Sequence, residues 1–250
     1  MILVICARKV ARILALTVLV ITLASFTVAL LQYIWDNQDF PAPWLFNVAR
    51  ENNIPTWYSS FQLLLCSILL ATIAAFTVRR GHRYASHWAV LSAVFLLLSL
   101  DEVASLHERL SHGPIASLAR NLPGLGAIGF FSRFWVVPAT IFTIIFVLAY
   151  LRFLVALPRE TRRLFILAGA VFVLGALGME MLSARVVSSY GIEDWGNVSG
   201  YPKMLVILQT VVEELFEMLG IVVFIYALLA YIGSHAKEIT VRVRVGNDDR

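Results

Sequence analysis

The residues most able to do chemistry are three glutamates in segment 209–220, QTVVEELFEMLG, which otherwise has the composition of a membrane-spanning helix. At 100° per residue, Glu213, Glu214 and Glu217 share with Gln209 one helix face about 140° wide. An ionised side chain costs a few kcal/mol or more at bilayer depth, so three acids here indicate a specific role. Buried carboxylates can relay protons, bind a cation or pair with arginines.

A second group of titratable side chains lies in residues 99–112, SLDEVASLHERLSH, before a Gly-Pro pair that ends the segment. Asp101 and Glu108 are seven residues apart and would share one face of a continuous helix. His107 and His112 add imidazoles to the same stretch. This helix is therefore predicted to present carboxylate and imidazole groups toward the glutamates described above.

A further acid, Glu180, lies about one turn from the outer end of another apolar run. Three predicted helices thus carry seven carboxylates on one side of the membrane, with three arginines as candidate partners. If each arginine neutralised one carboxylate, the other four must be protonated, hydrated or bound to a cation. The acids are Asp101, Glu102, Glu108, Glu180, Glu213, Glu214 and Glu217, and the arginines are Arg109, Arg133 and Arg185.

The mixture of carboxylates and imidazoles favours a divalent metal, and iron, manganese, zinc and magnesium all suit such ligands. The metal would activate water or oxygen toward a lipid or another membrane substrate. The predicted metal ligands are Asp101, His107, Glu108, His112, Glu180, Glu214 and Glu217, and the predicted catalytic residues are Asp101, Glu108 and Glu213.

Several specific metal motifs do not fit. The Glu-x-x-His repeat of di-iron bundles is absent from the chain. His107 and His112 are five residues apart, about 140° round a helix, whereas a zinc-protease motif needs histidines four apart on one face. Four methionines in the outer layer could supply a soft copper site, but membrane methionines usually serve packing. These are Met179, Met181, Met204 and Met218.

Two other functions are compatible with the same acids. In a proton- or cation-coupled transporter, Glu213, Glu214 and Glu217 would form an intramembrane relay. Against this, residues 221–230 are apolar apart from Tyr226, so no polar face continues to the other side. In a non-catalytic subunit or assembly factor, buried ion pairs would instead fix the register of the helices.

Cysteines and glycines carry weaker signals. Cys6 and Cys66 have no paired spacing, so they indicate neither a disulfide framework nor a thiolate metal site. Gly169, Gly175 and Gly178 lie in one apolar run, where glycine lets helices approach closely. We therefore predict close helix packing along that run.

The elements that must position these groups are membrane helices. Hydrophobic residues make up 60% of the chain, charged residues 14%, and the mean hydropathy is +0.81, which indicates an integral membrane protein. The prediction is an all-α bundle of six transmembrane helices forming one domain, residues 1–234, followed by a short tail, 235–250. The helices are predicted at about 13–34, 58–78, 84–108, 134–152, 164–184 and 204–232.

Basic residues predict the orientation. With both termini in the cytoplasm, 14 of the 20 lysines and arginines fall on the cytoplasmic side, as the positive-inside rule requires. In the same topology, 12 of the 16 acids fall in the outer half or the outer loops. Acidic residues contribute little to orientation, so this asymmetry points to an outward-facing site. The net charge of +4 is explained by topology and does not indicate nucleic-acid binding.

Three segments give the chain a resemblance to a broad set of uncharacterised bacterial multi-pass membrane proteins. These are Trp57-Tyr58-Ser59-Ser60, Ser99-Leu100-Asp101-Glu102 with His107-Glu108, and Glu213-Glu214-x-x-Glu217. The resemblance spans about residues 55–232 and implies a multi-pass protein of the bacterial inner membrane, without implying an activity. Membrane lipids are the predicted partners, together with a second copy of the chain or another membrane subunit.

Overall fold

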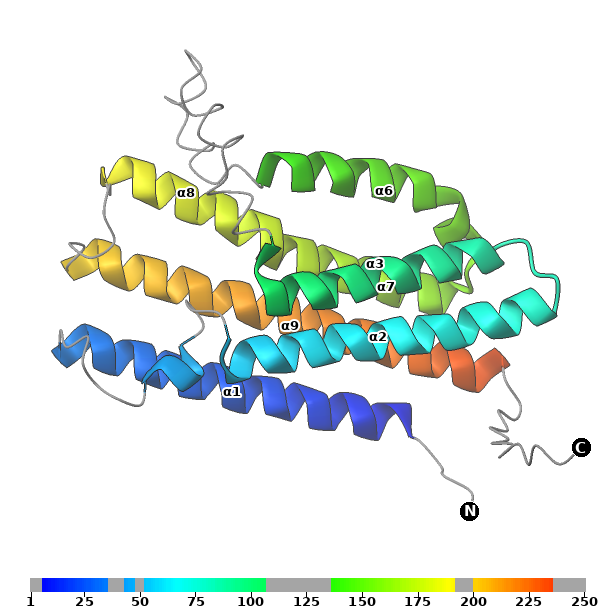
Figure 1. Ribbon diagram of the computed structural model, residues 1–250, viewed down its shortest axis with the longest axis horizontal. Coiled ribbons are helices and arrows are strands. Elements are labelled where there is room, and N and C mark those ends of the chain that lie inside the picture. Colours follow the sequence, from blue (N-terminus) through cyan, green and yellow to red (C-terminus); the bar gives the residue numbers. More distant parts are fainter. Residues whose placement is uncertain (1–5, 36–42, 48–51, 107–135, 192–199, 236–250) are drawn as a thin grey trace, which may run out of the picture.

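The computed structural model describes residues 6–35, 43–47, 52–106, 136–191 and 200–235, and every regular element among them is helical. Six helices are long and apolar enough to span a membrane, so the chain is an all-α, multi-pass membrane protein (Figure 1). The spans are α1 (Ala7–Trp35), α2 (Ile54–Arg79), α3 (Ala85–Ala104), α6 (Val136–Ala156), a composite fifth span and α9 (Gly200–His235). The fifth span joins α7 (Arg159–Val173), the π-helix η3 (Leu174–Met179) and α8 (Glu180–Ser189), and a short 3-10 helix, η1 (Pro43–Phe46), follows α1.

The helices begin and end at local signals in the sequence. α2 begins at Ile54, earlier than predicted, because the Asn53 side chain accepts a hydrogen bond of 3.0 Å from the backbone N–H of Thr56. Pro55 lies in the same first turn, where its missing N–H costs nothing. The turn between α2 and α3 contains Gly81 at φ +64°, a backbone conformation that glycine adopts without strain.

The third helix is shorter than predicted. α3 ends at Ala104, and Ser105 follows in the left-handed conformation at φ 50°. A left-handed residue commonly ends a helix because it turns the chain out of the helical path. The prediction that Asp101 and Glu108 share one face assumed a continuous helix to 108. The structure ends α3 four residues earlier, and Glu108 itself lies outside the described residues.

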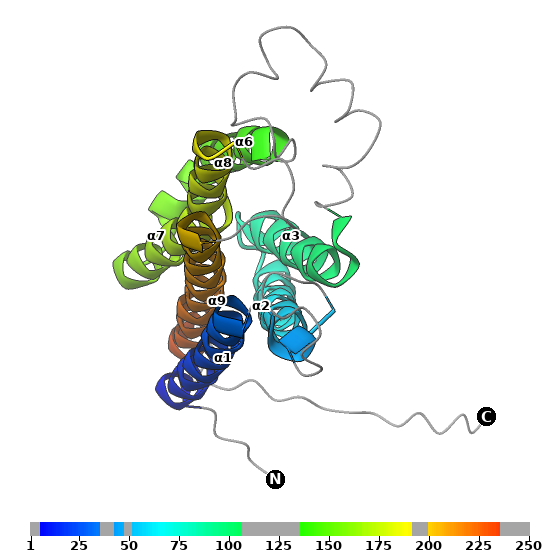
Figure 2. The ribbon, with the colours of Figure 1, turned by 90° about the vertical axis from the view of Figure 1, so that its left-hand side faces the viewer.

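The six spans form one bundle in which the beginning of α1 and the end of α9 lie at the same end (Figure 1). This is called the terminal end here, and the opposite one the distal end. α9 packs against α1, α2, α7 and η3, and it lies between these helices when the bundle is viewed from its distal end (Figure 2). At 1.5 Å per residue α9 is about 54 Å long and α3 about 30 Å. α8 and α9 therefore extend beyond the distal end of α3 (Figure 1).

Aromatic side chains fill the core of the terminal half. Trp88 of α3 contacts the ring of Phe153 in α6 at 4.9 Å between centroids and that of Phe165 in α7 at 5.9 Å. Phe95 of α3 stacks on Phe224 of α9 at 4.8 Å, with only 3° between the ring planes. These residues belong to or pack against one continuous hydrophobic cluster. The core of the terminal half thus consists mainly of packed aromatic and aliphatic side chains.

Buried polar side chains are concentrated in the distal half. Of the 13 buried polar or charged residues in the described part of the chain, ten lie here. They come from five different elements or their caps, so the polarity belongs to the interior of the bundle and not to one helix. The ten are Ser25, Asn53, Thr56, Ser59, Ser60, Gln62, Ser99, Glu180, Ser183 and Gln209.

Candidate functional site

Glu217 lies within electrostatic range of carboxylates contributed by three helices. Its side chain interacts electrostatically with Glu214 and Glu213 of α9, Glu102 of α3 and Glu180 of α8. About 27 Å of helix separate Glu217 from the terminal end of α9, which is nearly the thickness of a bilayer core. This carboxylate cluster lies at the level of the bundle where α3 ends.

The stacked rings of Phe95 and Phe224 explain why Glu102 reaches the cluster. α3 and α9 run in opposite directions. Glu102 lies seven residues after Phe95, and Glu217 lies seven residues before Phe224. Seven residues bring a helix back to nearly the same face, about 20° away, so the ring contact places the two glutamates opposite each other. Asp101 is turned about 100° from Glu102 around α3.

Two reciprocal serine contacts hold α3 at this height. Ser60 and Ser99 each donate a hydrogen bond of 2.9 Å to the other's backbone carbonyl oxygen. Ser67 and Ser92 repeat the arrangement at 2.8 and 2.9 Å. The second pair is seven residues from the first on both helices, which is the spacing of an antiparallel helix pair. These contacts fix the register between α2 and α3 and hence the position of Glu102.

The fifth span approaches the cluster through a glycine. A Cβ atom added to Gly175 would lie 2.9 Å from the backbone oxygen of Glu213 and 2.9 Å from the Cγ of Glu217. A similar approach occurs at Gly220, where a Cβ would lie 2.8 Å from the backbone nitrogen of Phe172. The predicted close packing is thus confirmed at Gly175, the one position of the three at which any neighbour lies within 3.4 Å.

Neutral polar groups lie in the same half of the bundle as the carboxylates. Gln62 of α2 donates a hydrogen bond of 3.4 Å to the hydroxyl of Tyr58, which itself donates to the backbone oxygen of Leu14 in α1 at 3.0 Å. The Oε1 atoms of Gln62 and Gln209 are buried, and neither has a hydrogen-bond partner among the described residues. Buried amide oxygens without partners are uncommon and call for water or a ligand.

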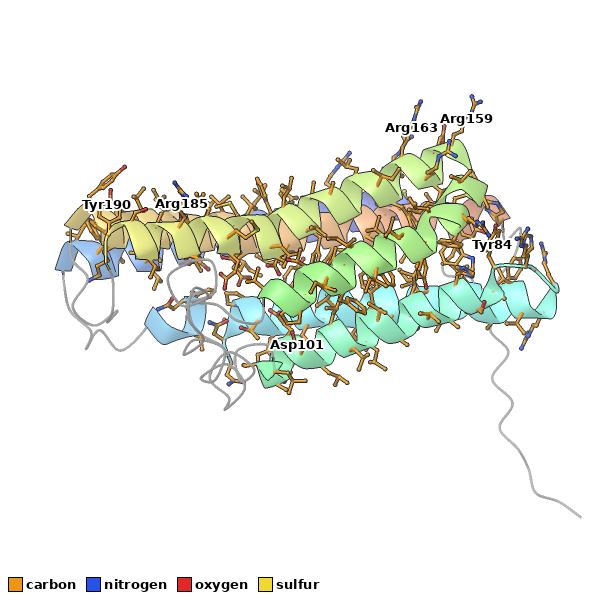
Figure 3. The ribbon with its side chains drawn as sticks, turned by 90° about the horizontal axis from the view of Figure 1, so that it is seen from above. Tyr84, Asp101, Arg159, Arg163, Arg185 and Tyr190 are labelled. Atoms are coloured by element: carbon orange, nitrogen blue, oxygen red, sulfur yellow. The ribbon has the colours of Figure 1, made fainter. Side chains whose placement is uncertain are left out.

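The structure brings together four of the predicted site residues, namely Glu180, Glu213, Glu214 and Glu217. Glu102, which was counted among the acids but not predicted as a ligand, joins them. Asp101 lies on α3 near its distal end, about 100° around the helix from Glu102 (Figure 3). The predicted residues His107, Glu108 and His112 and the candidate partners Arg109 and Arg133 lie outside the described residues.

The third candidate arginine, Arg185, is exposed and projects from the face of α8 that is remote from Asp101 (Figure 3). Within the described ranges, no three histidine, cysteine, aspartate or glutamate side chains are grouped closely enough to hold a metal ion. Any metal would therefore need ligands beyond the described residues or a closer approach of the glutamates.

Sequence comparison identifies the family but adds no activity. A search of curated proteins and a search of solved structures give no match. One family profile matches residues 13–232, a range that includes all or most of each of the six spans and every acid of the carboxylate cluster. The chain therefore belongs to the family described as a domain of unknown function, DUF8692.

Proposed function

We propose that the protein binds a divalent cation at the carboxylate cluster and uses it for chemistry on a lipid or another membrane-embedded substrate. The observation that carries this proposal is the convergence of acids from α3, α8 and α9 around Glu217. Glutamates drawn from three separate helices repel one another when ionised, and a shared cation relieves that repulsion.

The available donor atoms suit a hard cation. Carboxylate and amide oxygens are the ligands that magnesium, calcium and manganese prefer, and iron and zinc also accept carboxylates with imidazole. Gln209 lies one turn before Glu213 and offers a buried amide oxygen. The ligand set that we propose is Glu102, Glu180, Glu213, Glu214 and Glu217, completed by Asp101, His107, Glu108 or His112 near the end of α3.

The core of the terminal half is packed with aromatic rings. This packing favours a site that is open to one side of the membrane and argues against a transporter. A proton or cation conduit needs polar groups through both halves of the bundle. Between Glu217 and the terminal end, the bundle instead contains the packed rings of Phe95, Phe165 and Phe224. We further propose that the distal end faces outward from a bacterial inner membrane, because the exposed arginines gather at the terminal end.

Metal-dependent thermal stability tests the proposal. The purified protein, stripped with a chelator, is melted with and without manganese, magnesium, zinc or ferrous iron. A ligand at one hundred times its Kd stabilises the folded state by about 2.7 kcal/mol, which is about 5 to 11 °C for a chain of this size. We expect such a shift with at least one metal, and we expect Glu217→Gln to abolish it.

Glu160→Gln is the matched control, because Glu160 is exposed in the first turn of α7 at the terminal end. This variant should keep the full metal-dependent shift. Absence of a shift with all four metals, together with a higher melting temperature of metal-free Glu217→Gln than of the wild type, would contradict the proposal. That result would support buried acids that serve helix packing or proton transfer.

A further inference from the structure

The π-helix η3 interrupts the fifth span immediately before Glu180. Upstream of it, Thr161, Phe165 and Ala168 form a buried face, with exposed fractions of 8%, 7% and 2%. Downstream, Glu180 and Ala184 are buried, with exposed fractions of 3% and 2%. The two buried faces lie on the same side of the bundle, against α9.

An unbroken α-helix could not align these two faces. At 100° per residue counted from Thr161, Glu180 would lie about 100° away and Ala184 about 140° away, whereas Met179 would lie in line with the buried face. If the span absorbs one extra residue, Glu180 returns to about 0° and Ala184 to about 40°.

Side-chain exposure distinguishes these two registers. Leu182 would lie about 60° from the buried face in an unbroken helix and about 160° away when one residue is absorbed. It is 46% exposed, whereas Ala184 is 2% exposed. Both values agree with the shifted register and disagree with the unbroken one.

We infer that η3 is a positioning element that brings Glu180, in place of Met179, into the carboxylate cluster. A π-helix widens the turn through i→i+5 hydrogen bonds and so accommodates one additional residue without rotating the rest of the helix. Such segments occur mostly as single turns inside α-helices, and they are frequent at functional sites. Without η3, a thioether would occupy the position of a carboxylate.

Gly175 links this element to the other acids. It lies within η3 and contacts the backbone of Glu213 and the side chain of Glu217. The same six residues therefore set the rotation of Glu180 and the packing of Glu217. The inferred contribution of Glu180 to cation binding rests on the proposed function, whereas the inferred register does not.

Spin labelling tests the register without reference to any ligand. In a background with Cys6→Ala and Cys66→Ala, single nitroxide labels are introduced at Leu182→Cys and Ala184→Cys in lipid bilayers. Oxygen dissolves in the lipid, so a lipid-facing label collides with it more often than a buried label. We expect at least a twofold higher oxygen accessibility at 182 than at 184. The reverse order would overturn the inferred register.

A pair of length changes tests the positioning role. Deletion of Gly178 removes the extra residue, so a regular α-helix then carries Glu180 to the same face and the cation-dependent melting shift should survive. Insertion of one alanine after Gly178 turns Glu180 by about 100° and should abolish that shift while the protein stays folded and monodisperse. In an ordinary helix the two changes would be equally harmful, and equal loss would overturn the inference.

The outcomes separate the two proposals. If the wild type shows no melting shift with any metal but the spin labels report the expected order, the cation site fails and the register stands. If the wild type binds metal but Glu180→Gln leaves the shift unchanged, Glu180 does not contribute to cation binding, and the inferred role of η3 in placing it there is overturned. Glu180→Asp, which keeps the charge, should retain part of the shift if Glu180 acts as inferred.

Discussion

Asp101 and Glu102 are neighbours in sequence, yet they occupy different places relative to Glu217. Both are acids at the end of an apolar run, and nothing in their local sequence distinguishes them. The difference arises from the contact between Phe95 and Phe224, which sets the rotation of α3 against α9. This aromatic contact thus places Glu102 on the side of α3 that faces Glu217, about 100° around the helix from Asp101.

The two glycines of η3 provide a matched pair of variants at the residue scale. Gly175→Ala should destabilise the protein by about 1–3 kcal/mol, because its Cβ would lie 2.9 Å from the backbone oxygen of Glu213, which is part of a rigid helix. Gly178→Ala should change stability by no more than about 1 kcal/mol, since its nearest neighbour is Leu174 Cδ2 at 3.6 Å. Reversible unfolding in mixed detergent micelles measures both.

Because both changes remove the same backbone freedom of glycine, the difference between the two variants isolates the contact with α9. Equal effects of Gly175→Ala and Gly178→Ala would show that the fifth span does not press against α9 at Gly175. A larger effect of Gly178→Ala would contradict the described packing altogether.

At the scale of elements, α2 and α3 are paired by serines. Two of the three segments that the sequence analysis noted, Trp57-Tyr58-Ser59-Ser60 and Ser99-Leu100-Asp101-Glu102, meet in the structure through Ser60 and Ser99. Tyr58 of the first segment also joins α2 to α1 through its hydroxyl. These segments therefore carry helix-pairing contacts as well as acids, and the pairing places Glu102 beside Glu217.

A double-mutant cycle measures this pairing. Ser60→Ala and Ser99→Ala should be coupled by about 0.6–1.7 kcal/mol, the range found for hydrogen bonds between membrane helices. Ser60→Ala combined with Ser92→Ala is the control and should be additive, because Ser92 bonds to Ser67 one heptad away. Additivity in both combinations would mean that the serine contacts do not set the register.

The attachment of α6 to the bundle rests on one aromatic group. Phe153 is 1% exposed and contacts Trp88, His87 and Tyr84, whereas Phe142 on the same helix is 57% exposed. Phe153→Ala should cost about 3–5 kcal/mol through the cavity that it leaves. Phe142→Ala should cost less than about 1 kcal/mol. A similar loss of thermal stability in both variants would place the anchor of α6 elsewhere.

At the scale of the whole molecule, polar and apolar interiors divide the bundle into two halves. Most of the buried hydroxyls, amides and carboxylates in the described part of the chain lie in the distal half, and packed rings lie in the terminal half. The exposed arginines of the turns after α2 and α6 lie at the terminal end, where Arg80 stacks over the ring of Phe76 at 4.0 Å. Orientation in the membrane therefore decides from which side the carboxylate cluster is reached.

Chemical labelling of Cys6 can measure that orientation. It is exposed just before α1, and the backbone N–H of Lys9 lowers the pKa of its thiol by hydrogen bonding to the thiolate, which raises the reactive fraction near neutral pH. Cys66 is buried. With the termini in the cytoplasm, a charged maleimide should label inverted membrane vesicles and leave intact cells unlabelled.

Cys6→Ala should abolish the labelling, and Cys66→Ala should leave it unchanged. Labelling of intact cells with no labelling of inverted vesicles would reverse the orientation. The distal carboxylates would then face the cytoplasm, and the proposal of an outward-facing site would be withdrawn.

The amino-acid sequence alone determined the architecture, because its signals are local. A run of apolar residues long enough to cross a bilayer forms a helix whatever surrounds it, so all six spans were predicted, with ends displaced by up to six residues. The acids of α9 were recognised for the same reason, since three charges in one span stand out against any apolar background.

Only the tertiary structure decided which acids meet. The end of α3 at Ser105, the rotation that selects Glu102, and the extra residue absorbed by η3 leave no pattern in the local sequence. Each depends on contacts between residues far apart in the chain, such as Phe95 with Phe224 and Gly175 with Glu217. A helix can rotate or gain one residue at little local cost, so its facing side is fixed by packing and not by its own sequence.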